Sequence, residues 1–439
     1  MEQIKNMDAK SWYKNKFAEF EKSLNGEAKS LSHLSKKESI NKLDEISFPD
    51  LKDEDWKYTN VSAVIKENFL PAQLCKPSVS LEIEKYLFDF ADSSLLVFEN
   101  GIFNEKLSKI HRQKNVFIGS LKSFSLIDET NFQKNVKFRK TTAFDYLNES
   151  FGADGFALII GDKTTLEKPV QVLFINGNAD EKVLSSPRIF ITVGKFSEAD
   201  VILNFVGDND NYYLTNINTA VQLDENSNLN LFKIQNESKK SFHFDNINIS
   251  QSANSTLNHF NISFGGKLSR NGLSSNLIGE GAECNFNGLY IANENQHVDN
   301  HTFVNHAVAN CNSNETYKGI LDDLSRGVFN GKIVVAKDAQ KTNAYQSNKT
   351  ILLSDKSRID TKPQLEIFAD DVKCSHGATV GRLDEQALFY IISRGIPSDL
   401  AKSMLIRAFA NDVIEKVNLS ELKEQLNHMI FENLHRTEI

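Results

Sequence analysis

The chain has 439 residues, of which 40% are hydrophobic and 25% charged, and its formal net charge at neutral pH is −8. This composition is typical of soluble globular proteins, and the acidic balance without clustered Lys and Arg argues against nucleic acid as the main partner. No apolar stretch approaches the ~20 residues that span a bilayer, and the first residues lack the apolar core of a signal peptide. Four scattered cysteines do not make a disulfide framework, so we expect a cytoplasmic protein with reduced thiols and no membrane contact.

Residues 1–150 are predicted to form a mostly helical and mixed N-terminal region. An apolar stripe at helical spacing predicts a first helix from Asp8, as its N-cap, to Gly26, and a polar helix over 32–46 follows. We interpret Trp56, in the next turn, as an anchor that packs these helices onto the rest of the chain. Residues 80–180 mix short strands and helices. The stripe consists of Tyr13, Phe17, Phe20 and Leu24.

From about residue 185 the pattern becomes that of strands, with alternating apolar and polar residues such as Phe242 and Phe244. A small residue before a polar–apolar alternation recurs at separations of 28, 28, 27 and 27 residues. Such a period predicts a solenoid, here a parallel β-helix core over 151–383 with two or three strands per coil. Small residues are expected at the corners, and Val, Ile, Leu and Phe side chains are expected to stack inward from coil to coil. A large antiparallel sandwich is the alternative. The recurring residues are Ala199, Ser227, Ser255, Ala282 and Ala309.

Helical periodicity returns after Asp384, and residues 384–439 are predicted to form a C-terminal helical domain. Pro397 begins one helix, and an apolar stripe from Leu422 to Leu434 marks a last one. Such a helical end can cap a solenoid, or it can offer an apolar groove to a partner. The stripe predicted to be buried in the helix after Pro397 comprises Leu400, Ala401, Met404, Leu405, Ala408 and Phe409.

The candidate site residues are Cys374 and His376, which stand two residues apart. On a strand they share one face, so a thiolate donor and an imidazole donor are expected side by side. His297 and His301 also share a strand face, either as part of a polar ladder or as a transient iron site. The sequence lacks a phosphate-binding loop and the His-Glu-x-x-His, Cys-x-x-Cys and Gly-x-Ser-x-Gly motifs. Any ATP use is therefore expected from another subunit.

Several segments together resemble the SufB/SufD family of iron–sulfur cluster assembly proteins. Two departures favour its SufD members: Ser347 stands where SufB carries a cysteine, and Ser375 to Thr379 replaces the Glu-His-Glu-Ala-Thr of SufB. The match is dense from about 297 to 415 and loose over 80–180. The matching segments are Glu54–Thr59, Tyr317–Asp322, Arg326–Val335, Asp338–Lys349, Ile359–Ile367, Cys374–His376 and Ser393–Ile396.

The resemblance implies a right-handed parallel β-helix between helical ends, and a heterodimer with a SufB-like paralogue through the β-helix cores. It also implies docking of a SufC-like ATPase onto residues of about 384–437. In this interpretation His376 helps to hold iron or the nascent cluster opposite SufB, and Cys374 is the neighbouring candidate ligand. The chain would then be a non-enzymatic scaffold subunit that binds no nucleotide, with ATP hydrolysis supplied in trans.

Three alternatives remain at this point. Cys374 as nucleophile and His376 as its base would make the chain a β-helix enzyme. A purely structural partner without any ligand is the second alternative. The third concerns assembly: exposed β-helix edges are self-complementary, so the isolated chain can also form a homodimer.

Overall fold

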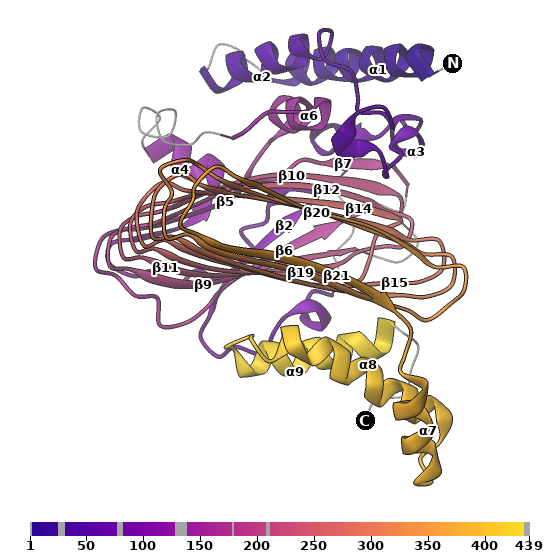
Figure 1. Ribbon diagram of the computed structural model, residues 1–439. Helices are drawn as coiled ribbons and strands as arrows, with labels where there is room; N and C mark the ends of the chain where they lie inside the picture. The colour runs from indigo at the N-terminus through magenta and orange to yellow at the C-terminus, as the bar shows by residue number, and fades with distance from the viewer. Residues whose placement is uncertain are drawn as a thin grey trace.

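The computed structural model describes residues 2–24, 31–76, 82–127, 138–177, 180–207 and 211–433. Its body is a parallel β-solenoid made of two facing sheets, which confirms the predicted fold (Figure 1). Within these residues, β8 to β21 form seven coils, and each coil gives one strand to each sheet. The N-terminal strands extend both sheets at one end, and β2–β3 and β4–β5 are the antiparallel pairs there.

The even-numbered strands of the coils belong to the 11-stranded sheet, called sheet A here. Sheet A runs in the order β20-β18-β16-β14-β12-β10-β8-β5-β4, with β7 beside β10 and β1 beside β7. Its strands are β1 Leu70–Pro71, β4 Val116–Ser120, β5 Gly155–Ile160, β7 Val183–Ser185, β8 Arg188–Val193, β10 Tyr213–Leu223, β12 Phe242–Gln251, β14 Leu268–Leu277, β16 His297–His306, β18 Arg326–Val335 and β20 Arg358–Ile367.

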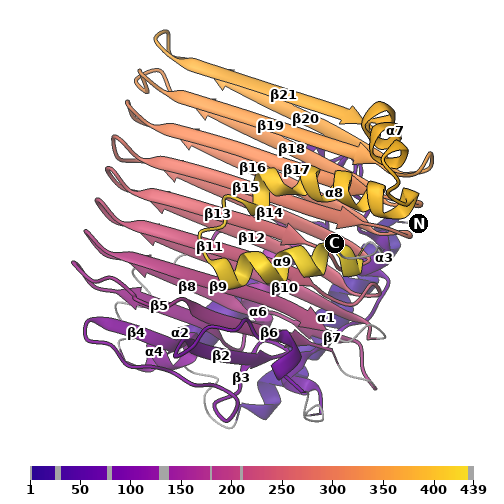
Figure 2. The same ribbon diagram turned by 90° about the horizontal axis from the view of Figure 1, so that it is seen from below.

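The odd-numbered strands of the coils form the 10-stranded sheet, called sheet B here, in the order β21-β19-β17-β15-β13-β11-β9-β6-β2-β3. Figure 2 shows the coils side on, stacked from the N-terminal strands to β21. The strands of sheet B are β2 Ser94–Glu99, β3 Ile102–Phe103, β6 Val170–Asn176, β9 Glu198–Gly207, β11 Asn228–Asn236, β13 Thr256–Ser263, β15 Glu283–Ala292, β17 Asn312–Leu321, β19 Asn343–Leu352 and β21 Lys373–Gly381.

The corners before the strands of sheet B explain the sequence repeat. Each corner before β9, β11, β13, β15, β17 and β19 places a residue with positive φ before a small buried residue, because the chain turns sharply where little space remains. The predicted repeat was right for Ser227, Ser255 and Ala282 but wrong in phase at its two ends. Ala199 lies inside β9, two residues after the corner residue Ser197. Ala309 lies two residues before the corner residue Cys311. The observed corners are Phe196-Ser197, Asn226-Ser227, Asn254-Ser255, Gly281-Ala282, Asn310-Cys311 and Lys341-Thr342.

N-terminal helices cover the outer face of sheet A (Figure 1). Trp56 is buried there against Phe144 and Phe244, and the Arg270 guanidinium lies 3.7 Å from its ring, so the predicted anchor is confirmed. The predicted N-cap was wrong, because Asp8 lies inside the first helix; Gly26 falls outside the described residues. The elements are α1 Glu2–Ser23, α2 Leu31–Lys42, η2 Glu54–Trp56, α3 Ser62–Ile65, η3 Ala72–Leu74, η4 Glu84–Tyr86, α4 Leu121–Ile127 and α6 Ala143–Phe151.

The C-terminal helices are α7 Glu385–Ser393, α8 Ser398–Ile414 and α9 Ser420–Asn433. Helices α8 and α9 pack along the outer face of sheet B and do not cap the solenoid, so the cap interpretation was wrong (Figure 2). The predicted buried stripe of α8 was also wrong except for Ala401, because the helix turns a different face to the sheet. The residues of α8 that are buried are Ala401, Ser403, Ile406, Ala410, Val413 and Ile414.

The solenoid therefore has an apolar interior, and the outer faces of sheet A and sheet B are apolar too. The interior contains the stacked rings of Phe98, Phe174 and Phe205, with centroid separations of 4.9 and 4.7 Å. In contrast, Phe242 and Phe244 face outward to the N-terminal helices, although their alternation suggested an inward position. Within the described residues, no helix is long and apolar enough to cross a membrane.

Candidate functional site

The last coil of the solenoid is open. In the described part of the chain, β20 pairs only with β18 and β21 only with β19, so each has one edge without a neighbouring strand. The inward-facing residues of this coil continue the interior columns but have nothing above them. Ile367 and Val380, for example, continue the columns of buried Val335 and Thr350, yet 39% and 45% of their surface is exposed. The hydrophobic core is therefore exposed to solvent at this end of the solenoid.

Cys374 and His376 both face the interior at this open end. Cys374 pairs in register with Ala344, and His376 pairs with Gln346. Ala344 and Gln346 are fully buried, and neighbouring parallel strands align their side chains on one face. Cys374 packs at the margin of the core, whereas the His376 side chain is exposed. The two candidate ligands therefore stand together at the mouth of the solenoid.

The thiol of Cys374 is not activated by its surroundings. Burial raises its pKa above the ordinary value, and a backbone hydrogen bond with Ala344 offsets this only in part. A nucleophilic cysteine requires the opposite shift, usually from a nearby cation or an oriented base. The site therefore lacks the electrostatics of a cysteine nucleophile. It suits a soft ligand whose proton is displaced when a metal binds.

Below His376, the same column contains Gln346 and then Glu315, which pair in register on β19 and β17. Both side chains are fully buried. Glu315 Oε2 accepts hydrogen bonds from Thr302 Oγ1, at 2.6 Å, and from Gln346 Nε2, at 3.2 Å. Burial raises the pKa of Glu315 to about 7, against the effect of these two donors. An ionisable group thus lies two rungs beneath the open end.

His297 and His301 lie elsewhere, on the outer face of sheet A. His297 Nε2 is 3.0 Å from Thr59 Oγ1, and that hydroxyl donates to Asp299 Oδ2 at 2.5 Å. His301 Nε2 is 3.0 Å from Asp299 Oδ1. Burial alone would raise the pKa of Asp299, but the nearby Arg270 and His301 outweigh this effect and hold the pKa well below its usual range. The carboxylate therefore stays ionised. These contacts fasten the segment around Thr59 to the solenoid.

The structure does not bring the two candidate pairs together, because His297 and His301 lie on the outer face of sheet A, whereas Cys374 and His376 lie at the open end. Within the described ranges, no group of three or more His, Cys, Asp and Glu side chains is placed to hold a metal ion. At the open end, the described residues therefore bring together two candidate donors, Cys374 and His376.

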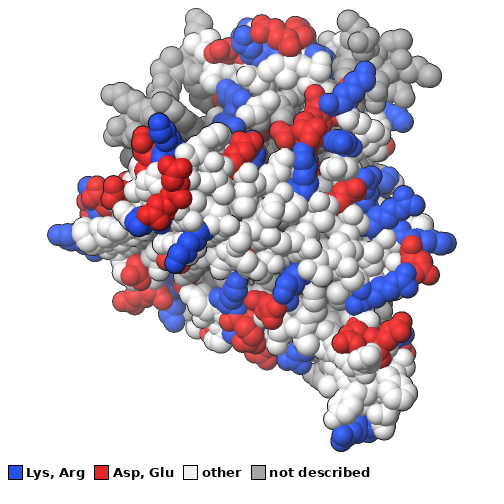
Figure 3. All heavy atoms as spheres, in the orientation of Figure 1, with Lys and Arg blue, Asp and Glu red and all other residues white. Residues whose placement is uncertain are grey.

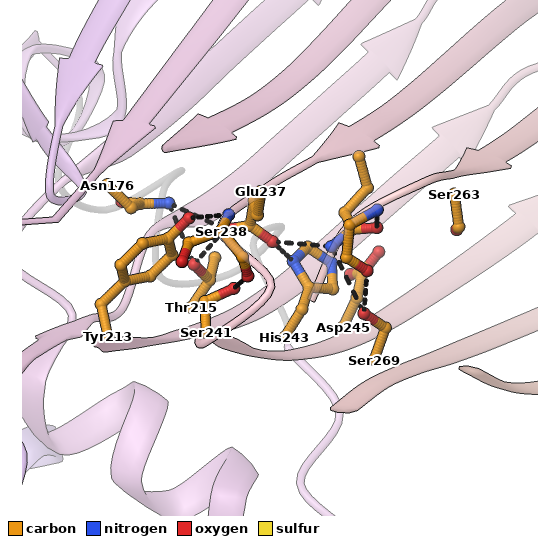
Figure 4. Close-up of polar contacts among 12 residues, drawn as sticks. Asn176, Tyr213, Thr215, Glu237, Ser238, Ser241, His243, Asp245, Ser263 and Ser269 are labelled. Carbon is orange, nitrogen blue, oxygen red and sulfur yellow. Dashed lines mark hydrogen bonds and ion pairs between the residues drawn. The ribbon is translucent and has the colours of Figure 1, made fainter. Parts of the chain in front are cut away.

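A second polar cluster lies deep inside the earlier coils and was missed in the sequence (Figure 4). Glu237 Oε2 is 2.6 Å from His243 Nδ1, and both side chains are completely buried. Thr215 Oγ1 donates to Glu237 Oε1 at 2.6 Å, and Gln235 Nε2 donates to Oε2 at 3.1 Å. Burial opposes the charge of Glu237, yet His243 and these donors lower its pKa below the ordinary value. His243 was overlooked because Phe242 and Phe244, its apolar neighbours, seemed to mark the inner face.

Comparison with known proteins decides the family. The model of the SUF system FeS cluster assembly SufBD core domain matches residues 174–409, and that of the SufBD protein N-terminal region matches residues 7–172. The chain belongs to the SufBD family. Iron–sulfur cluster assembly protein SufD of Escherichia coli is 33% identical over 384 residues, which cover 86% of this chain and 87% of that protein.

Other relatives are similar over comparable lengths. A SufBD family protein of Synechocystis is 29% identical over 402 residues, covering 88% of each chain. Protein ABCI7, chloroplastic, of Arabidopsis thaliana is 28% identical over 395 residues, covering 87% of this chain and 82% of its own length. The chain is thus a SufBD family protein of iron–sulfur cluster assembly, similar to SufD along most of its length.

Proposed function

We propose that this SufBD protein is a non-enzymatic scaffold subunit that pairs with a SufB-like paralogue through its open end. The nascent cluster, or the iron that begins it, would be held between His376 and Cys374 and ligands of the partner. The observation that carries this proposal is the uncovered last coil, which presents both donors among unpaired strand edges. Iron and sulfide are the cargo of this site.

The open end has the chemistry of an interface core. Its apolar residues include the inward-facing Ile367 and Val380 and the corner residue Phe368, of which 63% is exposed. Figure 3, in the orientation of Figure 1, looks onto this end and shows a largely uncharged centre ringed by Lys, Arg, Asp and Glu. An apolar centre with a charged rim is typical of protein interfaces, and free strand edges can pair with strands of a second solenoid. The same edges would support a homodimer of the isolated chain.

The ligand chemistry fits an assembling cluster. Thiolate and imidazole are both known ligands of iron–sulfur centres. Two donors from one chain leave coordination positions that a partner can fill and later release, so the interface can take up and give away its cargo. A cysteine opposite His376 on the SufB-like partner would supply a further sulfur ligand.

We further propose that a SufC-like ATPase docks on the C-terminal helices, and that this chain itself binds no nucleotide. Helix α7 projects from the body, and Phe389 and Tyr390 expose 74% and 58% of their surface there (Figures 1 and 3). Helix α8 is fastened to the solenoid by Lys318, whose Nζ donates to the Phe409 carbonyl at 2.7 Å and to the Asp412 carboxylate. Movement of the helices would thereby act on β17 and the coils beside it.

The experiment replaces His376 by Ala and co-purifies the chain with its SufB-like and SufC-like partners. Iron and acid-labile sulfide are measured after anaerobic reconstitution. We expect cluster formation to be lost while the complex still assembles. The matched control is His111→Ala, because His111 is also exposed but lies far from β21 in the fold. Normal cluster content in the His376 variant would remove this residue from the mechanism.

A further inference from the structure

Gln346 lies directly beneath the candidate ligand His376. The two residues pair in register on adjacent strands, and adjacent strands lie about 4.8 Å apart. Gln346 is completely buried, whereas the imidazole above it is exposed. The side chain of Gln346 therefore lies in the first buried layer beneath the open end of the solenoid.

The amide of Gln346 has a fixed orientation. Its Nε2 donates to Glu315 Oε2, one rung deeper, and that same oxygen accepts from Thr302 Oγ1 on the opposite sheet. Gly331 makes room for this arrangement, because a Cβ atom at that position would lie 2.1 Å from Gln346 Nε2. Glu315 Oε2 already accepts from Thr302, and a proton retained on Glu315 would lie on the unpaired Oε1, so Oε2 acts as an acceptor and selects the NH2 side of the amide.

The other end of the amide is left without a partner. Gln346 Oε1 is buried and has no hydrogen-bond partner among the described residues. Leaving a buried acceptor unpaired is unfavourable, and such groups in native structures usually have a specific reason. Since Nε2 is held by Glu315 below, the oxygen of the planar amide points away from that carboxylate. The next polar side chain on this face of the column is His376.

We propose that Gln346 is a positioning residue for His376. Its Oε1 would accept the N–H of one ring nitrogen when the imidazole turns inward, so the other nitrogen, without a proton, faces the iron. Metal-binding histidines commonly donate their second N–H to a carbonyl or carboxylate, which fixes both the tautomer and the ring plane. Glu315 acts through Gln346 by holding the amide in the required orientation. This inference rests on the proposed function of His376.

The test compares two buried amides of the same strand. Gln346→Leu removes the acceptor beneath His376, and Asn348→Leu removes an equally buried amide on the same face, which pairs instead with Ala378. Ferrous iron binding by the anaerobic complex with the SufB-like partner is measured for each. We expect about a 10- to 100-fold weaker affinity in the Gln346 variant, as for other losses of a ligand's supporting hydrogen bond, and no such loss in the Asn348 variant.

A spectroscopic measurement separates positioning from general damage. Nitrogen-15 shifts of the His376 ring in the complex should show one tautomer in the native chain and in the Asn348 variant. They should show a mixture in Gln346→Leu. A single tautomer together with native iron affinity in Gln346→Leu would overturn the inference. Retained iron binding in His376→Ala would instead contradict the proposed function, so the two failures are distinguishable.

A swapped pair keeps the inference testable even if Gln346→Leu does not fold. In the double variant Gln346→Glu/Glu315→Gln, the new amide can donate to the new carboxylate, whose second oxygen remains free to accept from His376. We expect this double variant to regain the single tautomer and the iron affinity. A mixed tautomer in a correctly folded double variant would contradict the assigned hydrogen bond.

Discussion

The solenoid contains two polar clusters made of similar residues, one covered by coils on both sides and one at its open end. In the covered cluster, the Glu237 carboxylate has His243, Thr215 and Gln235 around it, and the Glu237 and His243 side chains are completely buried. At the open end, His376 is exposed and Gln346 retains an unpaired oxygen. Whether neighbouring coils cover an ionisable side chain therefore decides its role in this protein. The covered cluster holds the fold together, whereas the uncovered one remains available to a ligand or partner.

We expect the largest loss of stability when the covered cluster is disrupted. Glu237→Ala leaves the buried His243 and three hydrogen-bond donors, Thr215, Gln235 and Asn176, without their acceptor, and such losses cost about 3–5 kcal/mol. We therefore expect the free energy of unfolding, measured in urea, to fall by that amount. The matched change His376→Ala at the open end should cost less than about 0.5 kcal/mol, as surface substitutions usually do. Equal losses in the two variants would contradict the division between covered and open clusters.

Glu315 lies between the two regions, and its effect depends on pH. Its pKa is raised from 4.5 to about 7, so the folded state retains a proton that the unfolded chain has lost. Stability is therefore unaffected below pH 4.5, falls as the pH rises to 7, and is about 3 kcal/mol lower above that. Glu315→Gln should remove this dependence. Unfolding measured at pH 5, 6, 7 and 8 checks the prediction, and a pH-independent difference between variant and native chain would refute it.

His259 allows a direct comparison of a covered and an exposed histidine, because it lies in the same column as His376 but under several coils. Both of its ring nitrogens lack partners among the described residues, and burial lowers its pKa to about 3. Replacing it by Leu removes two unpaired polar atoms, so we expect the chain to be stabilised by about 1–3 kcal/mol at pH 7.

The gain should be greater at pH 5, because the unfolded chain then binds a proton on His259 that the folded chain does not. Iron binding should be unchanged in the His259 variant. A loss of iron binding would show that the covered part of the column also takes part in ligand binding.

The sequence was sufficient to predict the solenoid, because coils of nearly equal length repeat the same corner chemistry. It also identified Trp56 as an anchor and placed Cys374 and His376 on one face. It could not show which face of a strand is the inner one, because helices cover the outer faces of both sheets and make them apolar too. Phe242 and Phe244 were misplaced, and His243 was missed, for that reason.

The remaining errors have a related cause. Small residues at the corners were recognised by type, but Ala199 and Ala309 are also small and lie two positions out of phase. The buried face of α8 depends on where the helix crosses sheet B, which its periodicity does not specify. Gln346 carries no motif, and its unpaired oxygen becomes visible only when the register with Glu315 and His376 is known.

The central claim is that the uncovered coil is the surface that a SufB-like partner covers. Hydrogen–deuterium exchange of β20 and β21 tests it directly, because their outward amides have no strand to bond in the isolated chain. In the monomeric chain we predict rapid exchange of these amides. After the partner is added we predict strong protection of β20 and β21, with little change in the covered strands β10 to β14. Unchanged exchange of β20 and β21 in an assembled complex would contradict the account.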